Sequence, residues 1–243
     1  MTLDEKYYFY EKSVQNVDFE VDFLELLYKK FFLTTPQIFR EDFSGSSLLS
    51  LEYSKRFSQK AFCIDLDPEP LNFGKKRANK WMTFCQEDVV QTKVQANIIA
   101  AFNFSYCIFK KRSELLKYFI NVKKTLLKEG FFILDFFGGN EAFLEIRESK
   151  KISKEETYYW ECEKFNALNQ EGIFSIHYKK KSQPIEKRVF SYDWRLWSPV
   201  ELRDLLEESG FKNISFYLEE DDEYVLKQEE TMEGCFLGYL VAR

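Results

Sequence analysis

The spacing of apolar residues divides the first half of the chain into alternating strand-like and helix-like segments. Short apolar runs such as 96–102 (ANIIAAF) and 131–137 (FFILDFF) are typical of strands that are buried on both faces. In other segments apolar residues recur every three or four positions, as on one face of an amphipathic helix. The predicted strands are 36–40, 61–65, 81–86, 96–102 and 131–137, and the predicted helices are 18–32, 46–56, 68–79 and 113–128.

The pattern changes after about residue 140. Residues 157–194 contain aromatic-rich runs of period two separated by turn-like breaks, which predicts antiparallel strands. A helix at 198–208 and strands at 211–218 and 235–242 then resume the earlier style, with the acidic stretch 219–233 expected as a hairpin connection.

The order of segments predicts an α/β fold of one domain. Alternation indicates a mainly parallel, seven-stranded sheet, and the closing hairpin makes the last strand antiparallel. We expect residues 36–139 and 198–243 to form the core, 1–35 a helical lead-in or lid, and about 140–197 an antiparallel insertion that covers a substrate.

Composition narrows the class of partner. The chain has 243 residues, 45% hydrophobic, and a net charge of −5, which gives no global attraction to nucleic acid or to an acidic membrane. Five scattered cysteines and one histidine make a zinc site improbable, so no metal is expected. No apolar run approaches the roughly 18 residues of a membrane span, and the first residues lack a signal peptide's apolar core. We therefore expect a cytoplasmic protein, a monomer or homodimer.

The stretch 37–67 has the features of a nucleotide-cofactor site. A small-residue turn around Gly45 follows the first strand, and Asp65 ends the second strand twenty residues later, where an acid can bind a ribose. Only one glycine is present, whereas a dinucleotide fingerprint needs several for the backbone to approach a pyrophosphate. S-adenosylmethionine (SAM) has no phosphate and makes a weaker demand on the loop.

Five motifs resemble a bacterial-type family of class I SAM-dependent methyltransferases whose substrates are mostly unassigned. That family reads approximately LREDFCGT, VDLDPE, NFSY, DLYGG and FSYDWRLW. Here the corresponding segments are FREDFSGS (39–46), IDLDPE (64–69), NFSY (103–106), DFFGG (135–139) and FSYDWRLW (190–197). Ser44 replaces a usual cysteine, and Ser47 stands where a glycine is more usual. The resemblance implies a Rossmann-like fold, SAM as cofactor and S-adenosylhomocysteine (SAH) as product.

The resemblance also implies roles for individual residues. Glu41 would fix the methionine amino group, Asp65 the ribose hydroxyls and Asp88 the adenine amino group. Asp67 reads better as the N-cap of the next helix. The complete expected cofactor set is Arg40, Glu41, Phe43, Ser44, Gly45, Asp65, Leu66, Asp88, Val89, Asn103, Phe104 and Ser105.

The acceptor side is less defined. Tyr10, Tyr106 and His177 are candidate catalytic residues, and Tyr10, Tyr192, Trp194 and Arg195 candidate substrate contacts, together with Asp193. Simpler interpretations stay open: an Asp193–Arg195 pair that fixes the insertion, a packing histidine, and N-terminal tyrosines that only pack. NFSY lacks the prolines of the Asn-Pro-Pro-Tyr motif, which disfavours nucleobase amines and glutamine amides as acceptors.

The resulting hypothesis is methyl transfer to an N or O nucleophile of a small molecule, or next of a protein side chain. No nucleic-acid or membrane partner is favoured. The alternatives are a nicotinamide-dependent oxidoreductase and an inactive binding protein that keeps the fold.

Overall fold

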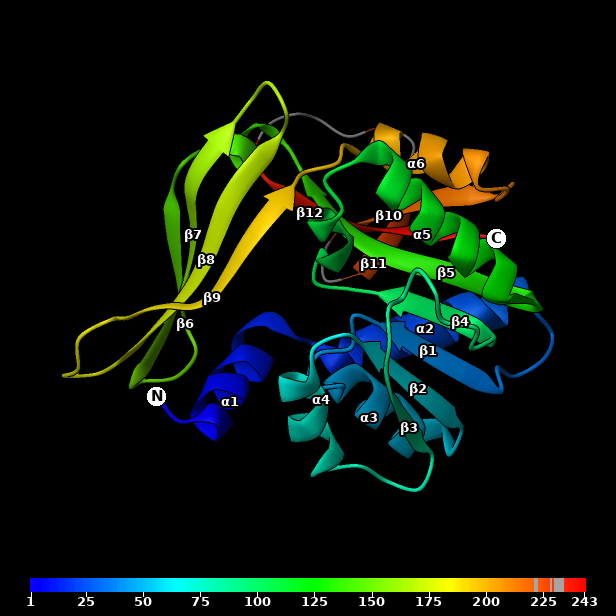
Figure 1. Cartoon of the computed structure of the whole chain (residues 1–243), viewed down its shortest axis with the longest axis horizontal. Helices are drawn as coiled ribbons and strands as arrows, with labels where there is room; N and C mark the ends of the chain where they lie inside the picture. The colour runs from blue at the N-terminus through cyan, green and yellow to red at the C-terminus, as the bar shows by residue number, and fades with distance from the viewer. Residues whose placement is uncertain (221–222, 228, 230–233) are drawn as a thin grey trace.

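Two sheets organise the computed structural model, which describes residues 1–220, 223–227, 229 and 234–243 (Figure 1). The larger, sheet A, has eight strands in the order β11-β10-β12-β5-β4-β1-β2-β3. The smaller, sheet B, has the order β6-β7-β8-β9. The strands of sheet A are β1 (Ile38–Asp42), β2 (Lys60–Asp65), β3 (Met82–Gln86), β4 (Ala96–Ala101), β5 (Leu126–Gly138), β10 (Ile214–Glu220), β11 (Glu223–Lys227) and β12 (Phe236–Ala242).

The pairing in sheet A confirms the mainly parallel sheet with an antiparallel last strand. Strands β1 to β5 pair in parallel, and β12 runs antiparallel between β5 and β10. The expectation of seven strands was wrong by one, because β11 forms within the acidic stretch 219–233 and pairs with β10. The rest of that stretch lies partly outside the described residues.

Six α-helices accompany the sheets in the described part of the chain, and two of their ends differ by three or more residues from the sequence prediction. α4 ends near residue 75 rather than 79, and α5 ends at Thr125 because Leu126 already pairs with Ala96 of β4. Strand pairing here overrides helical spacing. The helices are α1 (Leu3–Val14), α2 (Val17–Phe31), α3 (Leu48–Phe57), α4 (Pro68–Lys75), α5 (Arg112–Thr125) and α6 (Pro199–Glu208).

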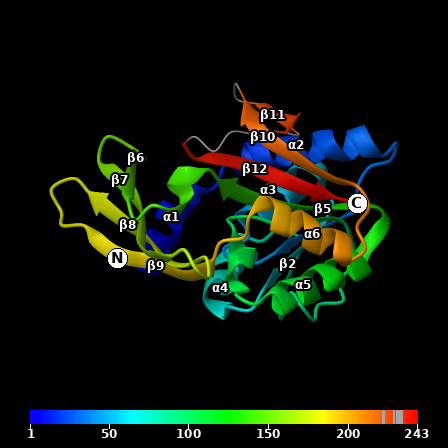
Figure 2. The same ribbon diagram turned by 90° about the horizontal axis from the view of Figure 1, so that it is seen from above.

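Helices cover both faces of sheet A (Figures 1 and 2). α5 and α6 share one apolar cluster with β5, and α2 and α3 share another cluster with the opposite face. All six residues of β4 are buried, as the unbroken apolar run predicts. No helix among the described residues is long and apolar enough to span a membrane.

Sheet B follows β5 and stands at the end of sheet A toward which the parallel strands run (Figure 1). Its inner face is aromatic: Phe174 and Trp194 join the core of sheet A, and Tyr178 stacks on Phe9 of α1. The antiparallel insertion is confirmed, and β6 extends it by one strand that the sequence pattern did not predict. Its strands are β6 (Arg147–Lys151), β7 (Glu156–Asn166), β8 (Glu171–Lys180) and β9 (Glu186–Arg195).

A buried ion pair lies under the first strand. The Arg40 guanidinium places Nε and Nη2 each 2.9 Å from an oxygen of Asp42, and both side chains are fully buried. Arg40 also donates to Thr125 Oγ1 and to the carbonyl of Val94, and the Tyr118 hydroxyl donates to Asp42. The pair therefore connects β1 to α5 on one face of the sheet.

Replacing Arg40 with methionine should lower the free energy of unfolding by about 3–5 kcal/mol, because Asp42 would remain as a buried charge without a cation. Urea-induced unfolding followed by circular dichroism measures this cost. The control is Arg203→Met, which breaks an exposed pair with Asp204 and should cost less than about 1 kcal/mol. Equal costs for the two variants would contradict a structural role for Arg40.

Candidate active site

The first part of the candidate site is the loop between β1 and α3. Three of its residues have a left-handed backbone: Phe43 (φ 56°), Gly45 (φ 50°) and Ser47 (φ 59°). The Gly45 amide donates to Asp65 Oδ2 over 2.7 Å, so the loop is attached to the end of β2. The space in front of the Gly45 Cα is open, and a ligand can approach the backbone there.

Asp65 carries the charge at the end of β2. Its second oxygen accepts from the Asp67 amide over 2.9 Å. Partial burial raises the pKa of Asp65, although these backbone donors oppose the rise. Asp67 caps α4 by accepting from the Glu69 amide, as predicted.

Glu41 projects from the opposite face of β1 to Arg40. Its carboxylate accepts from both the amide and the hydroxyl of Ser50 on α3. Burial raises the pKa of Glu41 to about 8, despite these two hydrogen bonds. A cation placed beside it, such as an amino group, would favour the ionised form.

The second part of the site is the end of β4. Asn103 (φ 58°) and Phe104 (φ 55°) are both left-handed, a costly conformation for residues with a side chain. Asp135 of β5 holds them: its two oxygens accept from the Asn103 amide over 2.6 Å and from the Phe104 amide over 2.9 Å. Removal from water raises the pKa of Asp135 to about 7.

A cavity of about 450 Å³ opens beside this turn. Glu20 of α2 and Asp135 both line it, and Glu20 is only 8% exposed. Burial, followed by the charge of Asp135, raises the pKa of Glu20 to about 8. The remaining lining comes from Ser13, Val14, Asn16, Phe19, Asn103, Phe104, Phe136, Lys150, Tyr158, Tyr224, Leu237, Gly238 and Tyr239.

Helix α1 connects the two parts of the site. A capping box at Thr2 starts the helix. Glu11 pairs with Arg77 and accepts from the hydroxyl of Ser46, which fixes the helix to the Gly45 loop. Tyr10 hydrogen-bonds Tyr192 of sheet B.

Asp88 and its neighbours form a turn after β3. The Asp88 carboxylate accepts from the Val90 amide over 2.9 Å. The Val89 side chain is buried in the core, and Leu66 at the end of β2 is 67% exposed. Ser44 is buried in the Gly45 loop, and the Ser105 hydroxyl donates to the carbonyl of Phe102. Each of these residues lies just after the carboxyl end of a parallel strand, as the sequence pattern predicted.

Several predicted site residues have other partners in the structure. The Arg40 guanidinium is fully buried and donates to Asp42, Thr125 and the Val94 carbonyl, so we assign it to stability rather than to cofactor binding. Phe43 packs its ring against Phe109 and Tyr118. Tyr106 is 2% exposed within the core and does not line the cavity.

Sheet B separates its candidates by face. His177 points to the outer face, where Nε2 lies 2.7 Å from Glu161 and Nδ1 accepts from the Arg188 amide. Glu161 and Glu163 form with it a group that could hold a metal, but Arg147 and Arg188 already pair with these carboxylates. His177 is therefore buried, is held by Glu161 and the Arg188 amide, and does not line the cavity beside the β4 turn.

Residues of the last motif attach the insertion to the rest of the fold. Arg195 donates to the Lys110 carbonyl and to Glu201, and lies over the Trp197 ring. Asp193 pairs with Lys110 instead of Arg195. Tyr192 and Trp194 share the inner face of sheet B, and their ring centroids lie 4.4 Å apart.

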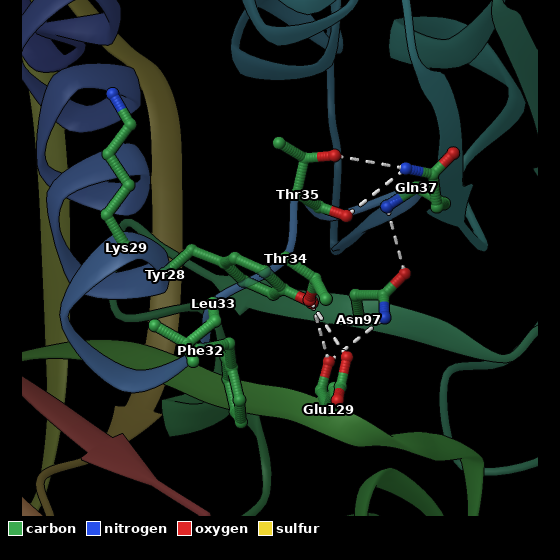
Figure 3. A pocket seen from close by; sticks show the side chains of 9 residues that line it. All are labelled: Tyr28, Lys29, Phe32, Leu33, Thr34, Thr35, Gln37, Asn97 and Glu129. Carbon is green, nitrogen blue, oxygen red and sulfur yellow. Dashed lines mark hydrogen bonds between the residues drawn. The ribbon is translucent and has the colours of Figure 1, made fainter.

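A larger hollow of about 860 Å³ lies at the opposite edge of sheet A (Figure 3). Its polar groups mostly bond to one another: Tyr28 Oη and Asn97 Nδ2 both donate to the carbonyl of Glu129, and Thr34 donates to the Glu129 carboxylate. This edge holds the beginnings of the parallel strands, whereas ligands of open α/β sheets bind at the carboxyl ends.

Comparison with known proteins identifies the architecture. No protein-family model matches the chain, and a search of curated proteins finds no significant match. Among solved structures, a SAM-dependent methyltransferase from Clostridium acetobutylicum aligns over 98% of this chain and 97% of its own, with a TM-score of 0.73 and 15% identity. The fold is that of a class I SAM-dependent methyltransferase.

Two further structures align over almost the whole fold. The amino pentose methyltransferase CalS10 from Micromonospora echinaspora, solved with SAM, covers 98% of this chain and 97% of its own at a TM-score of 0.70 and 12% identity. The sugar N-methyltransferase KedS8 from Streptoalloteichus aligns over 95% of this chain and 90% of its own, with a TM-score of 0.67 and 14% identity. The shared fold includes the insertion as well as sheet A.

Sequence reasoning missed the acidic cavity. Glu20 lies in a helix with several acids, and nothing in its spacing distinguishes it from Asp18, Asp22 or Glu25 except that it falls beside the apolar stripe. Asp135 was available as a signal, since it is the one acid within the otherwise apolar run 131–137.

Glu20→Gln should make the protein more stable at high pH and leave it unchanged at low pH. An unfolded glutamate ionises near 4.5 but folded Glu20 near 8, so the folded state binds the proton more tightly between these values and stability falls as pH rises. Relative to the wild type, the free energy of unfolding of the variant should rise by on the order of 2–4 kcal/mol at about pH 8.5 and hardly change at about pH 5.

Chemical denaturation at the two pH values measures this gain. Glu25→Gln on the same helix, at a more exposed carboxylate paired with Lys29, is the matched control and should show no such pH-dependent gain. If Glu20→Gln and the wild type have the same free energy of unfolding at both pH values, ionisation of buried Glu20 does not destabilise the fold.

Proposed function

We propose that the protein is a SAM-dependent methyltransferase that acts on an N or O nucleophile of a small molecule. The observation that supports this most is Asp65 at the end of β2, hydrogen-bonded to the Gly45 loop in a methyltransferase fold. A protein side chain is the second candidate acceptor.

The residues at the strand ends fit the proposed cofactor. Asp65 offers two acceptor oxygens to the ribose hydroxyls, and Glu41 offers a carboxylate to the methionine amino group. Asp88, Val89 and Leu66 follow at the ends of β3 and β2, where the adenine would bind. When bound, SAM supplies an electrophilic methyl group on a sulfonium.

The chain mainly positions the acceptor and keeps water away. Asp135 fixes the turn at Asn103 and Phe104 next to the acceptor cavity, so the geometry there is set before binding. α1 and the inner face of sheet B enclose the same region. Tyr10, through its hydroxyl contact with Tyr192, remains the candidate for an acceptor contact.

An enclosed site favours a small acceptor. A cavity of about 450 Å³ is in the range of small-molecule pockets. Several structures with the same fold are N-methyltransferases of sugars or glycopeptides. The alternative of a nicotinamide-dependent oxidoreductase has less support, because the loop has a single glycine where a pyrophosphate needs more.

Asp65→Asn should weaken SAM and SAH binding at least tenfold, because an amide replaces one of the two acceptor oxygens that would face the ribose. Isothermal titration calorimetry with each ligand gives the affinities. Asp204→Asn, at an exposed acid of α6, is the control and should bind as the wild type does. Unchanged affinity in Asp65→Asn would contradict the proposed cofactor site.

Thermal shift with SAM, SAH and NADH separates the competing functions. We expect stabilisation by SAM and SAH and none by NADH. Stabilisation by NADH alone would favour the oxidoreductase, and no shift with any of the three would favour an inactive binding protein.

A further inference from the structure

The cavity beside the β4 turn has an unusual charge balance. Two carboxyl groups, Glu20 and Asp135, line it. Among the described lining residues the one cation is Lys150, whose side chain is exposed on β6 and hydrated. The described lining therefore places two acids in this cavity without a buried counter-charge.

Neither acid is explained by the fold alone. Asp135 holds the turn through two backbone amides, but a neutral acceptor could do so without the cost of burying a charge. Glu20 accepts from the Asn16 amide and otherwise faces the cavity. Buried acids kept at such cost commonly bind a cationic ligand or act in proton transfer.

The rest of the lining suits an organic cation. Phe19, Phe104, Tyr158 and Tyr239 contribute aromatic rings to the cavity. Ring faces attract ammonium groups, most strongly where water is excluded. Aromatic walls with a carboxylate are therefore complementary to an alkylammonium and not to an anion.

We propose that this cavity binds the acceptor as an ammonium ion, with Glu20 as its ion-pair partner, and that the methyl acceptor is thus an aliphatic amine. The proposal rests on the proposed methyltransferase function and specifies its substrate class. It also accounts for the proton that the ammonium must lose before its nitrogen can attack the methyl group. The ammonium nitrogen transfers one proton to a carboxylate oxygen of Glu20, which gives a neutral acid and a neutral amine with a free lone pair.

Asp135 is a positioning residue in this scheme. Its oxygens are occupied by the Asn103 and Phe104 amides, so its removal would distort the turn. Glu20→Gln keeps size and shape and removes only the charge, which makes it the informative variant. Glu25→Gln on the same helix is the matched control.

The test uses three ligands of one shape: cyclohexylamine, cyclohexanol and cyclohexanecarboxylate. Each is titrated at constant ionic strength into protein saturated with SAH, and binding is followed by thermal shift and calorimetry. We expect the amine to bind at least tenfold more tightly than the other two. Glu20→Gln should lose this preference, while Glu25→Gln keeps it and both variants bind SAH within twofold of wild type.

Proton release gives a readout that a merely structural role would not change. Near pH 7 Glu20 holds a proton without a ligand, so amine binding should release up to one proton, seen as a heat that depends on the buffer's ionisation enthalpy. Glu20→Gln should release less. The ionisable groups that face Glu20 and contribute to the total are Asp135, Glu41, Tyr10, Tyr239 and Lys150.

Three results would overturn the proposal. The first is equal binding of cyclohexanol and cyclohexylamine by the wild type. The second is unchanged amine affinity in Glu20→Gln. The third is a tenfold loss of SAH affinity in that variant, which would assign Glu20 to the cofactor. If SAH does not bind the wild type at all, the methyltransferase proposal fails, and amine binding to the protein alone still tests the cavity.

Discussion

The arrangement of the candidate site depends on acids that are removed from water at the carboxyl ends of the strands. Glu41 and Asp65 lie at the carboxyl ends of β1 and β2, Asp135 lies in β5, and Glu20 approaches from α2. Their pKa values are all raised, chiefly because burial disfavours the charged form. Burial also raises the pKa of Asp42, but there the Arg40 guanidinium lies beside the carboxylate and opposes the rise. Asp42 is thus stabilised by a buried cation, whereas the other acids accept hydrogen bonds and, among the described residues, have no buried cation beside them.

This division follows from the alternation of a strand. Arg40 and Asp42 point to the α5 face of β1, where a network with Thr125 and Tyr118 satisfies them. Glu41 points to the other face, toward Ser50. One strand therefore carries a structural ion pair on one side and a candidate ligand-binding acid on the other.

The sequence predicted those features of the fold that depend on local periodicity and on turn-forming residues. The parallel strands, the Gly45 loop and the acid twenty residues later depend on contacts close in sequence. The period of two could also have assigned Arg40 to the side opposite Glu41. The position of Glu20 could not be obtained in this way, because its burial depends on how α2 packs beside β5, β11 and β12. His177 was similarly ambiguous until the pairing of β7 with β8 fixed which face it occupies.

The same separation between local and long-range contacts explains why cofactor and acceptor sites differ in how well they can be predicted. The expected cofactor contacts lie at the carboxyl ends of strands or on the loops that follow them, so each is placed by its own strand. The acceptor cavity is assembled from α2, β4, β5, β12 and sheet B, which are distant in sequence. Sheet B and α1 are also attached by ion pairs between residues that do not line this cavity, such as Lys110–Asp193 and Glu11–Arg77. The fold can therefore keep one cofactor geometry while the acidic, aromatic cavity determines which nucleophile it accepts.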